Sequence, residues 1–218
     1  MFKEKKYLVI KNIITPELSK FLFRYMILKR KVVKKMLEDG YISSFETAFG
    51  FYEGDEQIPN TFTCYAEIAM EQLLLDFLPI MEKKTKLKLI PNYSYIRVYK
   101  KGDELLRHKD REECQISTTL NLGGDPWPIY VSPNENVGVP GSKKNISETS
   151  NAKGVKVNLS PGDMLVYRGV ELEHWRKPFE GEVCVQVFLH YNDKDLTIGK
   201  KYDNRPFIGL PSWFKGRK

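Results

Sequence analysis

Residues 93–99 read YSYIRVY, a run whose side chains alternate in character from one position to the next. A period of two is typical of a β-strand. The run also marks a change in the chain, because helical spacing dominates before residue 89 and short strands separated by turns come after it. The further strands predicted from here on span residues 115–122, 127–131, 155–159 and 164–167, with a hairpin formed by 174–179 and 183–191 across the turn 180–182.

The region before residue 89 carries the signals of two helices. Thr15 is suited to the N-cap of the first helix, Pro16 to its first position and Glu17 to its first turn. Apolar residues at helical spacing follow, and Gly40 lies past the predicted end near residue 38. The elements predicted here are a strand at 7–10, this first helix, a loop at 40–60 and a second helix at 63–83.

Helices followed by about eight short strands indicate an α+β chain whose strands close into a barrel or sandwich backed by the N-terminal helices. A jelly roll would bring strand ends together at one mouth, where ligands are usually held. We expect one domain over residues 1–218, with a helical support region at 1–88, a strand core at 89–192 and a basic tail at 193–218. The polar stretch 132–154 has the composition of a lid or binding loop.

Composition narrows the class of protein. No apolar run approaches the ~20 residues needed to span a bilayer, and the first residues lack a signal peptide, so no membrane association is expected. The three cysteines, Cys64, Cys114 and Cys184, are widely spaced and form no C-x-x-C pair. This pattern argues against a disulfide framework or a zinc ribbon and favours a reducing, cytoplasmic setting.

The net charge of +7 comes from the two ends of the chain. Residues 1–40 hold 11 Lys and Arg against 4 Asp and Glu, residues 194–218 hold 7 against 2, and 17 against 22 lie between them. Basic proteins often bind nucleic acid or an acidic surface. The basic ends permit a nucleic-acid partner without supporting one, because solvated Lys-rich faces explain the same charge.

The pair His108-x-Asp110, together with the distant His174, predicts a metal site. Side chains two residues apart in an extended segment point to the same side, so His108 and Asp110 can reach one ion. Two imidazoles and one carboxylate can occupy one face of an octahedral ion and leave the other face open, which suits non-haem Fe(II) oxygenases. The same ligands also allow zinc. The third histidine, His190, lies at the end of an apolar run and is interpreted as a core or rim residue.

From about residue 89 to 192 the chain resembles the 2-oxoglutarate- and Fe(II)-dependent dioxygenases, nearest to their prolyl 4-hydroxylase-like branch. The resemblance is carried by Tyr99 in a strand, Gly102 in a turn, then His108 and Asp110, and by the segment 160–167 (SPGDMLVY) before the distal histidine. It implies a double-stranded β-helix (a jelly roll, cupin-like) with N-terminal supporting helices. It also implies Fe(II), 2-oxoglutarate and O2, with oxidative decarboxylation to succinate and CO2 coupled to hydroxylation of a substrate.

The chain departs from this family at one place. The family generally holds the far carboxylate of 2-oxoglutarate with a Lys or Arg about ten residues after the distal histidine, where residues 183–185 here read VCV. Arg176, two residues after that histidine, is the predicted substitute, because its planar guanidinium can bind a carboxylate through two hydrogen bonds. Tyr99 is expected to add a phenolic hydrogen bond, and Gln186 and Arg97 are further candidate contacts.

The predicted function is therefore that of a Fe(II)- and 2-oxoglutarate-dependent hydroxylase. Its substrate is expected to be peptidyl, prolyl residues included, or a small molecule. The main alternative is a non-catalytic cupin-like module that binds a metal or another ligand. A capsid-type jelly roll is a third interpretation, and it would not require three correctly spaced ligands. The sequence specifies no oligomeric state.

Overall fold

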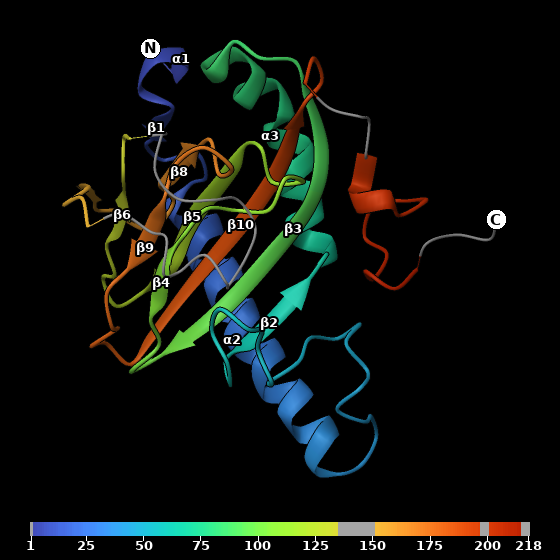
Figure 1. Ribbon diagram of the computed structural model, residues 1–218. Coiled ribbons are helices and arrows are strands. Elements are labelled where there is room, and N and C mark those ends of the chain that lie inside the picture. The colour runs from blue at the N-terminus through green and yellow to red at the C-terminus, as the bar shows by residue number, and fades with distance from the viewer. Residues whose placement is uncertain (1, 135–150, 197–200, 215–218) are drawn as a thin grey trace.

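The computed structural model describes residues 2–134, 151–196 and 201–214, and its framework is a pair of antiparallel sheets (Figure 1). The large sheet has the order β1 (Tyr7–Ile10), β8 (Met164–Tyr167), β5 (Ser117–Gly124), β10 (Val183–Asp193), β3 (Leu89–Lys100) and β2 (Phe62–Tyr65). The small sheet has the order β4 (Leu105–His108), β9 (His174–Arg176), β6 (Ile129–Val131) and β7 (Val155–Val157). The helical elements are α1 (Phe2–Lys5), α2 (Pro16–Glu38), α3 (Ile68–Thr85) and the short η2 (Lys201–Asn204).

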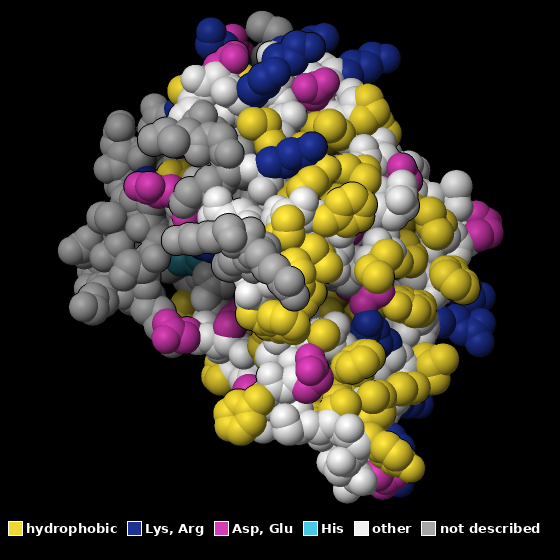
Figure 2. All heavy atoms as spheres, turned by 90° about the vertical axis from the view of Figure 1, so that its right-hand side faces the viewer, with side chains coloured by type: hydrophobic (Ala, Val, Ile, Leu, Met, Phe, Trp, Pro, Cys, Tyr) yellow, Lys and Arg dark blue, Asp and Glu magenta, His cyan; other side chains and the backbone are white. Residues whose placement is uncertain are grey.

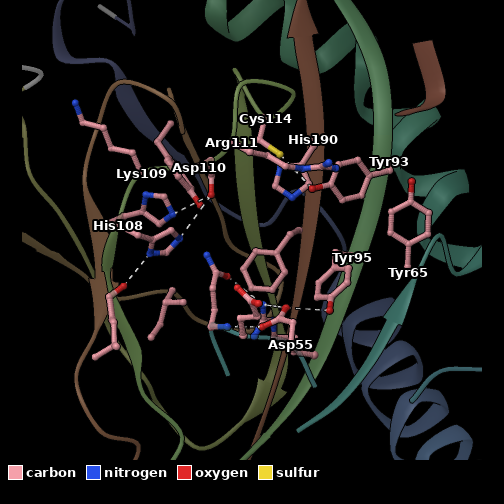
Figure 3. Close-up of a pocket in the computed structure, with 18 of the residues that line it drawn as sticks. Asp55, Tyr65, Tyr93, Tyr95, His108, Lys109, Asp110, Arg111, Cys114 and His190 are labelled. Atoms are coloured by element: carbon pink, nitrogen blue, oxygen red, sulfur yellow. Dashed lines mark hydrogen bonds and ion pairs between the residues drawn. The ribbon is translucent and has the colours of Figure 1, made fainter. Parts of the chain in front are cut away.

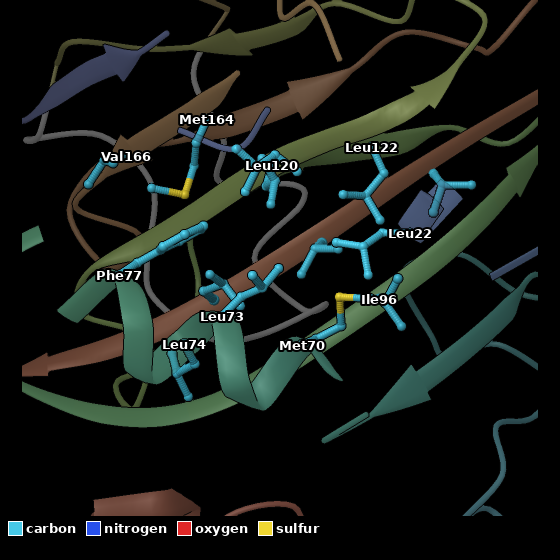
Figure 4. Packing of buried hydrophobic residues seen from close by; sticks show 14 of the residues in the cluster. Leu22, Met70, Leu73, Leu74, Phe77, Ile96, Leu120, Leu122, Met164 and Val166 are labelled. Atoms are coloured by element: carbon cyan, nitrogen blue, oxygen red, sulfur yellow. The ribbon is translucent and has the colours of Figure 1, made fainter. Parts of the chain in front are cut away.

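Helices α2 and α3 cover one face of the large sheet (Figure 1). Aliphatic side chains from alternate positions of the strands meet them there and form the main hydrophobic core (Figure 4). This core contains Leu22 and Met26 from α2, Met70, Leu74 and Phe77 from α3, and Ile96, Leu120, Val166 and Val187 from the sheet.

The opposite face of the large sheet, which we call the inner face, carries different side chains. The intervening positions of β3 and β10 hold Arg97, Tyr99, Gln186 and His190, and all four are buried. Two smaller apolar clusters lie on this side and join the large sheet to the small one. One sheet therefore separates an aliphatic core from a space that is lined by polar groups.

The first predicted helix is confirmed as α2. The Thr15 hydroxyl accepts a hydrogen bond from the backbone N–H of Leu18 at 3.3 Å, as expected of an N-cap, and Pro16 is the first helical residue. The helix ends at Glu38, and Gly40 follows with φ +72°, a conformation that glycine adopts without strain.

The second helix begins later than predicted, and the strand β2 stands where its first turn was expected. Residues 62–65 pair with β3, with Phe62 opposite Val98 and Tyr65 opposite Tyr95. Their aromatic and β-branched side chains fit a strand, but the helical spacing further along the chain obscured this local preference. Pro79 lies inside α3, which continues to Thr85.

The predicted hairpin of residues 174–191 is wrong. Strand β9 pairs with β4 and β6 in the small sheet, whereas β10 pairs with β3 and β5 in the large one. The connection between them is held by the Asp125 carboxylate, which accepts hydrogen bonds from the backbone N–H groups of Glu182 and Val183. Alternation identifies a strand but does not identify its partner, and that is why a local hairpin was predicted.

The described part of the C-terminal tail, residues 201–214, packs along the body of the protein. Buried Arg205 forms an ion pair with Glu71 of α3 at 3.0 Å, and the Asp203 carboxylate accepts a hydrogen bond from the Tyr65 hydroxyl at 2.7 Å. Hydrophobic side chains are prominent on the face of the molecule that carries this segment (Figure 2). Large exposed apolar residues of this region are Ile68, Phe207, Trp213 and Phe214.

Three further expectations concern loops, membranes and cysteines. Most of the predicted binding loop at 132–154 lies outside the described residues. No described helix has both the length and the apolar character needed to cross a membrane. Cys64, Cys114 and Cys184 are all buried with free thiols.

Candidate active site

Strands β4 and β9 bring the three predicted metal ligands together. His108 is the last residue of β4, His174 is the first of β9, and the two are paired across the small sheet. The Oδ1 atom of Asp110 lies 3.7 Å from His108 Nε2 and 3.4 Å from His174 Nε2 (Figure 3). All three ligand atoms lie within 4.8 Å of one another. Metal–ligand bonds of about 2.1 Å at right angles would place neighbouring ligand atoms about 3 Å apart, so this set fits one face of an ion.

Backbone carbonyls fix the orientation of both imidazoles. His108 Nδ1 lies 2.8 Å from the Leu106 carbonyl oxygen, and His174 Nδ1 lies 3.1 Å from the Leu172 carbonyl oxygen. A carbonyl oxygen can only accept, so each Nδ1 carries a proton, and in the neutral form of either ring Nε2 keeps its lone pair for a metal. Burial and the neighbouring ring of His174 lower the pKa of His108, which favours the neutral form that ligation requires.

Asp110 is the only anionic member of the ligand set. Burial by itself would raise the pKa of its carboxyl group, but the neighbouring His174 and His108 hold this pKa well below the usual value. The group is therefore a carboxylate at neutral pH. The ring of Tyr167 packs against His174 with centroids 4.6 Å apart and helps to keep that imidazole in place.

A cavity of about 450 Å³ opens beside the ligands, within the size range of small-molecule sites. His108, Asp110 and His174 form part of its wall. On the far side from His108, Figure 3 shows aromatic and charged side chains from the large sheet and from the loop before β2. These residues are Asp55, Tyr65, Tyr93 and Tyr95, and Arg111, from the loop that follows Asp110, also lines the cavity.

Arg176 is the residue predicted to bind the far carboxylate of 2-oxoglutarate, and we call it the clamp. It is 1% exposed and holds a charge that no described carboxylate neutralises. One terminal nitrogen donates to the Trp127 carbonyl, and the other donates to Thr119 Oγ1 at 3.2 Å. Its Nε has no partner among the described residues. Burial lowers the pKa of Arg176, because a cation enclosed without a counter-ion is costly. The residue is thus suited to bind an anion.

Tyr99 lies near two guanidinium groups, those of Arg97 and Arg176. Its hydroxyl is buried and unpartnered within the described structure, and burial raises its pKa to about 12. Arg97 pairs with the Asp55 carboxylate at 2.5 Å and donates to Gln57 at 3.2 Å, but its Nη1 is likewise unpartnered there. Both Tyr99 and Arg97 line the cavity, whereas Arg176 is not one of its lining residues.

Gln186, a predicted cosubstrate contact, does not line the described cavity. Its Oε1 accepts a hydrogen bond from Thr119 Oγ1 at 3.0 Å, and its Nε2 lies 3.1 Å from Cys184 Sγ. Because Thr119 also accepts from Arg176, Gln186 is connected to the predicted clamp through this one hydroxyl. The structure therefore gives Gln186 a supporting contact with the clamp and no place on the described cavity wall.

Sequence reasoning missed three residues that the structure brings to the site, Asp55, Ser117 and Gly169. Ser117 donates to the Asp110 carboxylate at 2.5 Å, and Gly169 lies against the same carboxylate. A signal for Ser117 exists in residues 115–122, where polar side chains recur at every second position of a predicted strand. Asp55 and Gly169 lie in irregular segments, where no periodic pattern identifies a contact.

This chain matches known proteins in structure but not in sequence. No protein-family model matches the chain, and no curated protein matches it by sequence. HygX from Streptomyces hygroscopicus, solved with nickel and 2-oxoglutarate, superposes with a TM-score of 0.59 at 14% identity, covering 93% of this chain and 88% of HygX. A Pseudomonas putida prolyl-4-hydroxylase gives 0.55 at 15% identity, covering 88% of this chain and 95% of that protein.

A third neighbour is the epimerase SnoN from nogalamycin biosynthesis. Its complex with Fe3+, α-ketoglutarate and nogalamycin RO gives a TM-score of 0.61 at 11% identity, covering 88% of this chain and 80% of SnoN. At such low identities the matches establish the fold alone. The chain therefore has the fold of the 2-oxoglutarate- and iron-dependent oxygenase superfamily, which confirms the resemblance seen in its sequence.

Proposed function

We propose that this protein is a Fe(II)- and 2-oxoglutarate-dependent oxygenase. The observation that carries the proposal is the convergence of His108 Nε2, His174 Nε2 and Asp110 Oδ1 beside a cavity. Two imidazoles and one carboxylate suit Fe(II), and they leave positions free for cosubstrates. When bound, the metal supplies the chemistry by which 2-oxoglutarate, O2 and a substrate C–H bond yield succinate, CO2 and a hydroxylated product.

We further propose that the two sheets are the halves of a double-stranded β-helix, or jelly roll, within one domain of 218 residues. The support is that all ligands and all candidate cosubstrate contacts come from residues 89–192. The N-terminal region then supplies the helical layer and the two edge strands β1 and β2. The tail contributes a packed segment at residues 201–214.

Buried polar groups without described partners on the inner face support a binding site for 2-oxoglutarate there. Arg97 Nη1, Tyr99 Oη and Arg176 Nε are three buried polar atoms without partners in the described structure. Buried polar groups are nearly always hydrogen-bonded, so a bound dicarboxylate would supply the hydrogen-bond partners that these three atoms lack in the described structure. In this proposal Tyr99 donates to the far carboxylate, Arg176 supplies the compensating charge, and Arg97 donates from the cavity wall.

The substrate would occupy the part of the cavity lined by Tyr65, Tyr93 and Tyr95. The volume suits a small molecule or one residue of a peptide. The structural neighbours include proteins of both kinds, since HygX was solved with hygromycin B and another neighbour is a prolyl-4-hydroxylase. Hydroxylation is the proposed outcome, although an epimerase and a carbocyclase share the fold.

An anaerobic titration tests this function before any substrate is known. The metal-free protein is given Fe(II) and then 2-oxoglutarate, and a visible metal-to-ligand charge-transfer band is recorded. We expect the band in the wild-type protein and its loss in His174→Ala, with unchanged circular dichroism for both. Metal binding without any band would contradict the proposal and favour a non-catalytic metal-binding module or a zinc site. Succinate release across peptides and small molecules would then identify the substrate.

A further inference from the structure

The hydroxyl of Ser117 lies between the ligand Asp110 and the third histidine of the chain. Ser117 is the first residue of β5 and is fully buried. Its Oγ lies 2.5 Å from Asp110 Oδ2, 3.1 Å from His190 Nδ1 and 3.2 Å from the Cys114 carbonyl oxygen. His190 is itself buried, and its ring packs on Tyr93 with centroids 4.6 Å apart. Figure 3 shows His190 and Tyr93 on the side of Asp110 away from His108.

The directions of these hydrogen bonds follow from the number of available protons. A serine hydroxyl has one proton, and both the Asp110 carboxylate and the Cys114 carbonyl can only accept. The contact to Asp110 is the shortest and involves a charge, so Ser117 donates there. His190 must then carry its proton on Nδ1 and donate to Ser117 Oγ. The result is a directed chain from His190 through Ser117 to Asp110.

The two oxygens of Asp110 consequently have separate partners. Oδ1 faces the Nε2 atoms of His108 and His174, whereas Oδ2 is bound by Ser117. A carboxylate whose second oxygen is already engaged offers a metal one oxygen. An octahedral ion held by three single protein atoms keeps three further positions, one more than if Asp110 bound through both oxygens.

Gly169 provides the room that this arrangement needs. A Cβ atom at this position would lie 2.1 Å from Asp110 Oδ2 and 2.5 Å from Ser117 Oγ. The backbone of Gly169 also holds the segment, because its carbonyl accepts from the Asp110 N–H at 2.9 Å and its N–H donates to the Gln115 carbonyl at 3.1 Å. Any side chain here would push the carboxylate or the serine out of position.

We propose that Ser117, oriented by His190 and accommodated by Gly169, is a positioning residue that holds Asp110 as a one-oxygen metal ligand. The inference rests on the proposed function, since it assigns a role around the same metal. It gives His190 a function that its place in an apolar run did not suggest. It also explains why all three histidines of this chain lie at one site.

The test compares metal binding among full-length, metal-free variants. Ser117→Ala removes the donor, and Ser19→Ala is the matched control, because Ser19 is equally buried and donates to the Leu122 carbonyl far from the ligands. His190→Asn retains an N–H near the Nδ1 position, whereas His190→Leu removes it. Co(II) is titrated into each protein, and its visible ligand-field spectrum reports both affinity and coordination geometry.

We expect Ser117→Ala to bind Co(II) about 10- to 100-fold more weakly than wild type, as is typical when the partner of a ligand is lost, with a changed spectrum. Ser19→Ala should match wild type, and His190→Asn should bind more tightly than His190→Leu. If Ser117→Ala does not fold, the two His190 variants decide the question, and equal affinities in that pair would overturn the inference.

The outcomes separate this inference from the proposed function. Equal Co(II) affinity and spectra for Ser117→Ala and wild type would overturn the inference alone. A wild-type protein that binds no metal would remove the proposed function and the inference together. Gly169→Ala provides an independent check, since it should reproduce the weaker binding of Ser117→Ala while both original side chains are still present.

Discussion

The two faces of the large sheet bury different kinds of side chain. On the helix-covered face, residues such as Leu74, Ile96 and Val187 bury only hydrocarbon against α2 and α3. On the inner face, Arg97 and Tyr99 are also buried but keep polar atoms without described partners. The first face lowers the free energy of the folded state, and the second raises it in order to hold ligands. The residues that stabilise the fold and the residues proposed to bind ligands therefore lie on opposite faces of one sheet.

This difference predicts opposite responses to the same kind of change. Shortening a side chain on the helix-covered face should cost stability and leave ligand affinity unchanged. Removing an unpaired polar group from the inner face should cost affinity and leave stability unchanged or improved.

The largest effect is expected for Arg176→Met. The loss of a buried cation from a carboxylate site should weaken 2-oxoglutarate binding by about 4 kcal/mol, or about 1000-fold. Because Arg176 has no described counter-ion, the free energy of unfolding of the protein without ligands should stay equal or rise. Calorimetric titration with 2-oxoglutarate and urea denaturation measure the two quantities.

Arg97→Met is the matched control for that experiment. It removes the ion pair with Asp55 and should therefore lower the free energy of unfolding. A larger loss of 2-oxoglutarate affinity in Arg97→Met than in Arg176→Met would transfer the role of clamp to Arg97.

Leu74→Ala probes the helix-covered face. Leu74 is fully buried in the main core, and its truncation should lower the free energy of unfolding by about 3 kcal/mol, measured by urea denaturation. The dissociation constant for metal in the folded protein should not change. A marked loss of metal affinity would show that the two faces are coupled and would contradict the separate roles assigned to them.

The inner face should also make the metal-free protein sensitive to acid. Burial lowers the pKa of His190 from 6.5 to about 4, so between pH 7 and pH 5 the unfolded chain takes up a proton that the folded chain does not. The free energy of unfolding should therefore fall by about 2 kcal/mol over this interval on account of His190. Urea denaturation at the two pH values should show a smaller change in His190→Asn; an identical change in that variant would contradict this origin.

Tyr99→Phe should give the smallest effect. It removes one hydroxyl that has no described partner, so the stability of the protein without ligands should hardly change. Binding of 2-oxoglutarate should weaken by about 1 kcal/mol, which is several-fold, as expected for a single hydrogen bond. A calorimetric titration identical to that of wild type would place the far carboxylate elsewhere in the cavity.

Much of this protein could be predicted from short stretches of sequence. Thr15 and Pro16 mark the start of α2 because capping depends on neighbouring residues alone. The pair His108 and Asp110 was recognised because two ligands one residue apart share a side of an extended segment, and the structure brings His174 to them. Local geometry and residue chemistry are enough for conclusions of this kind.

Only the tertiary structure decided which strands pair and which polar groups meet. Alternation in residues 174–191 predicted strands correctly but assigned β9 to the wrong sheet, because the period of a strand is the same whatever its partner. The contact between Arg97 and Asp55 joins residues that are 42 positions apart, and that between Ser117 and His190 joins residues 73 apart. Such contacts arise from packing across the chain, and packing leaves no periodic signal in the sequence.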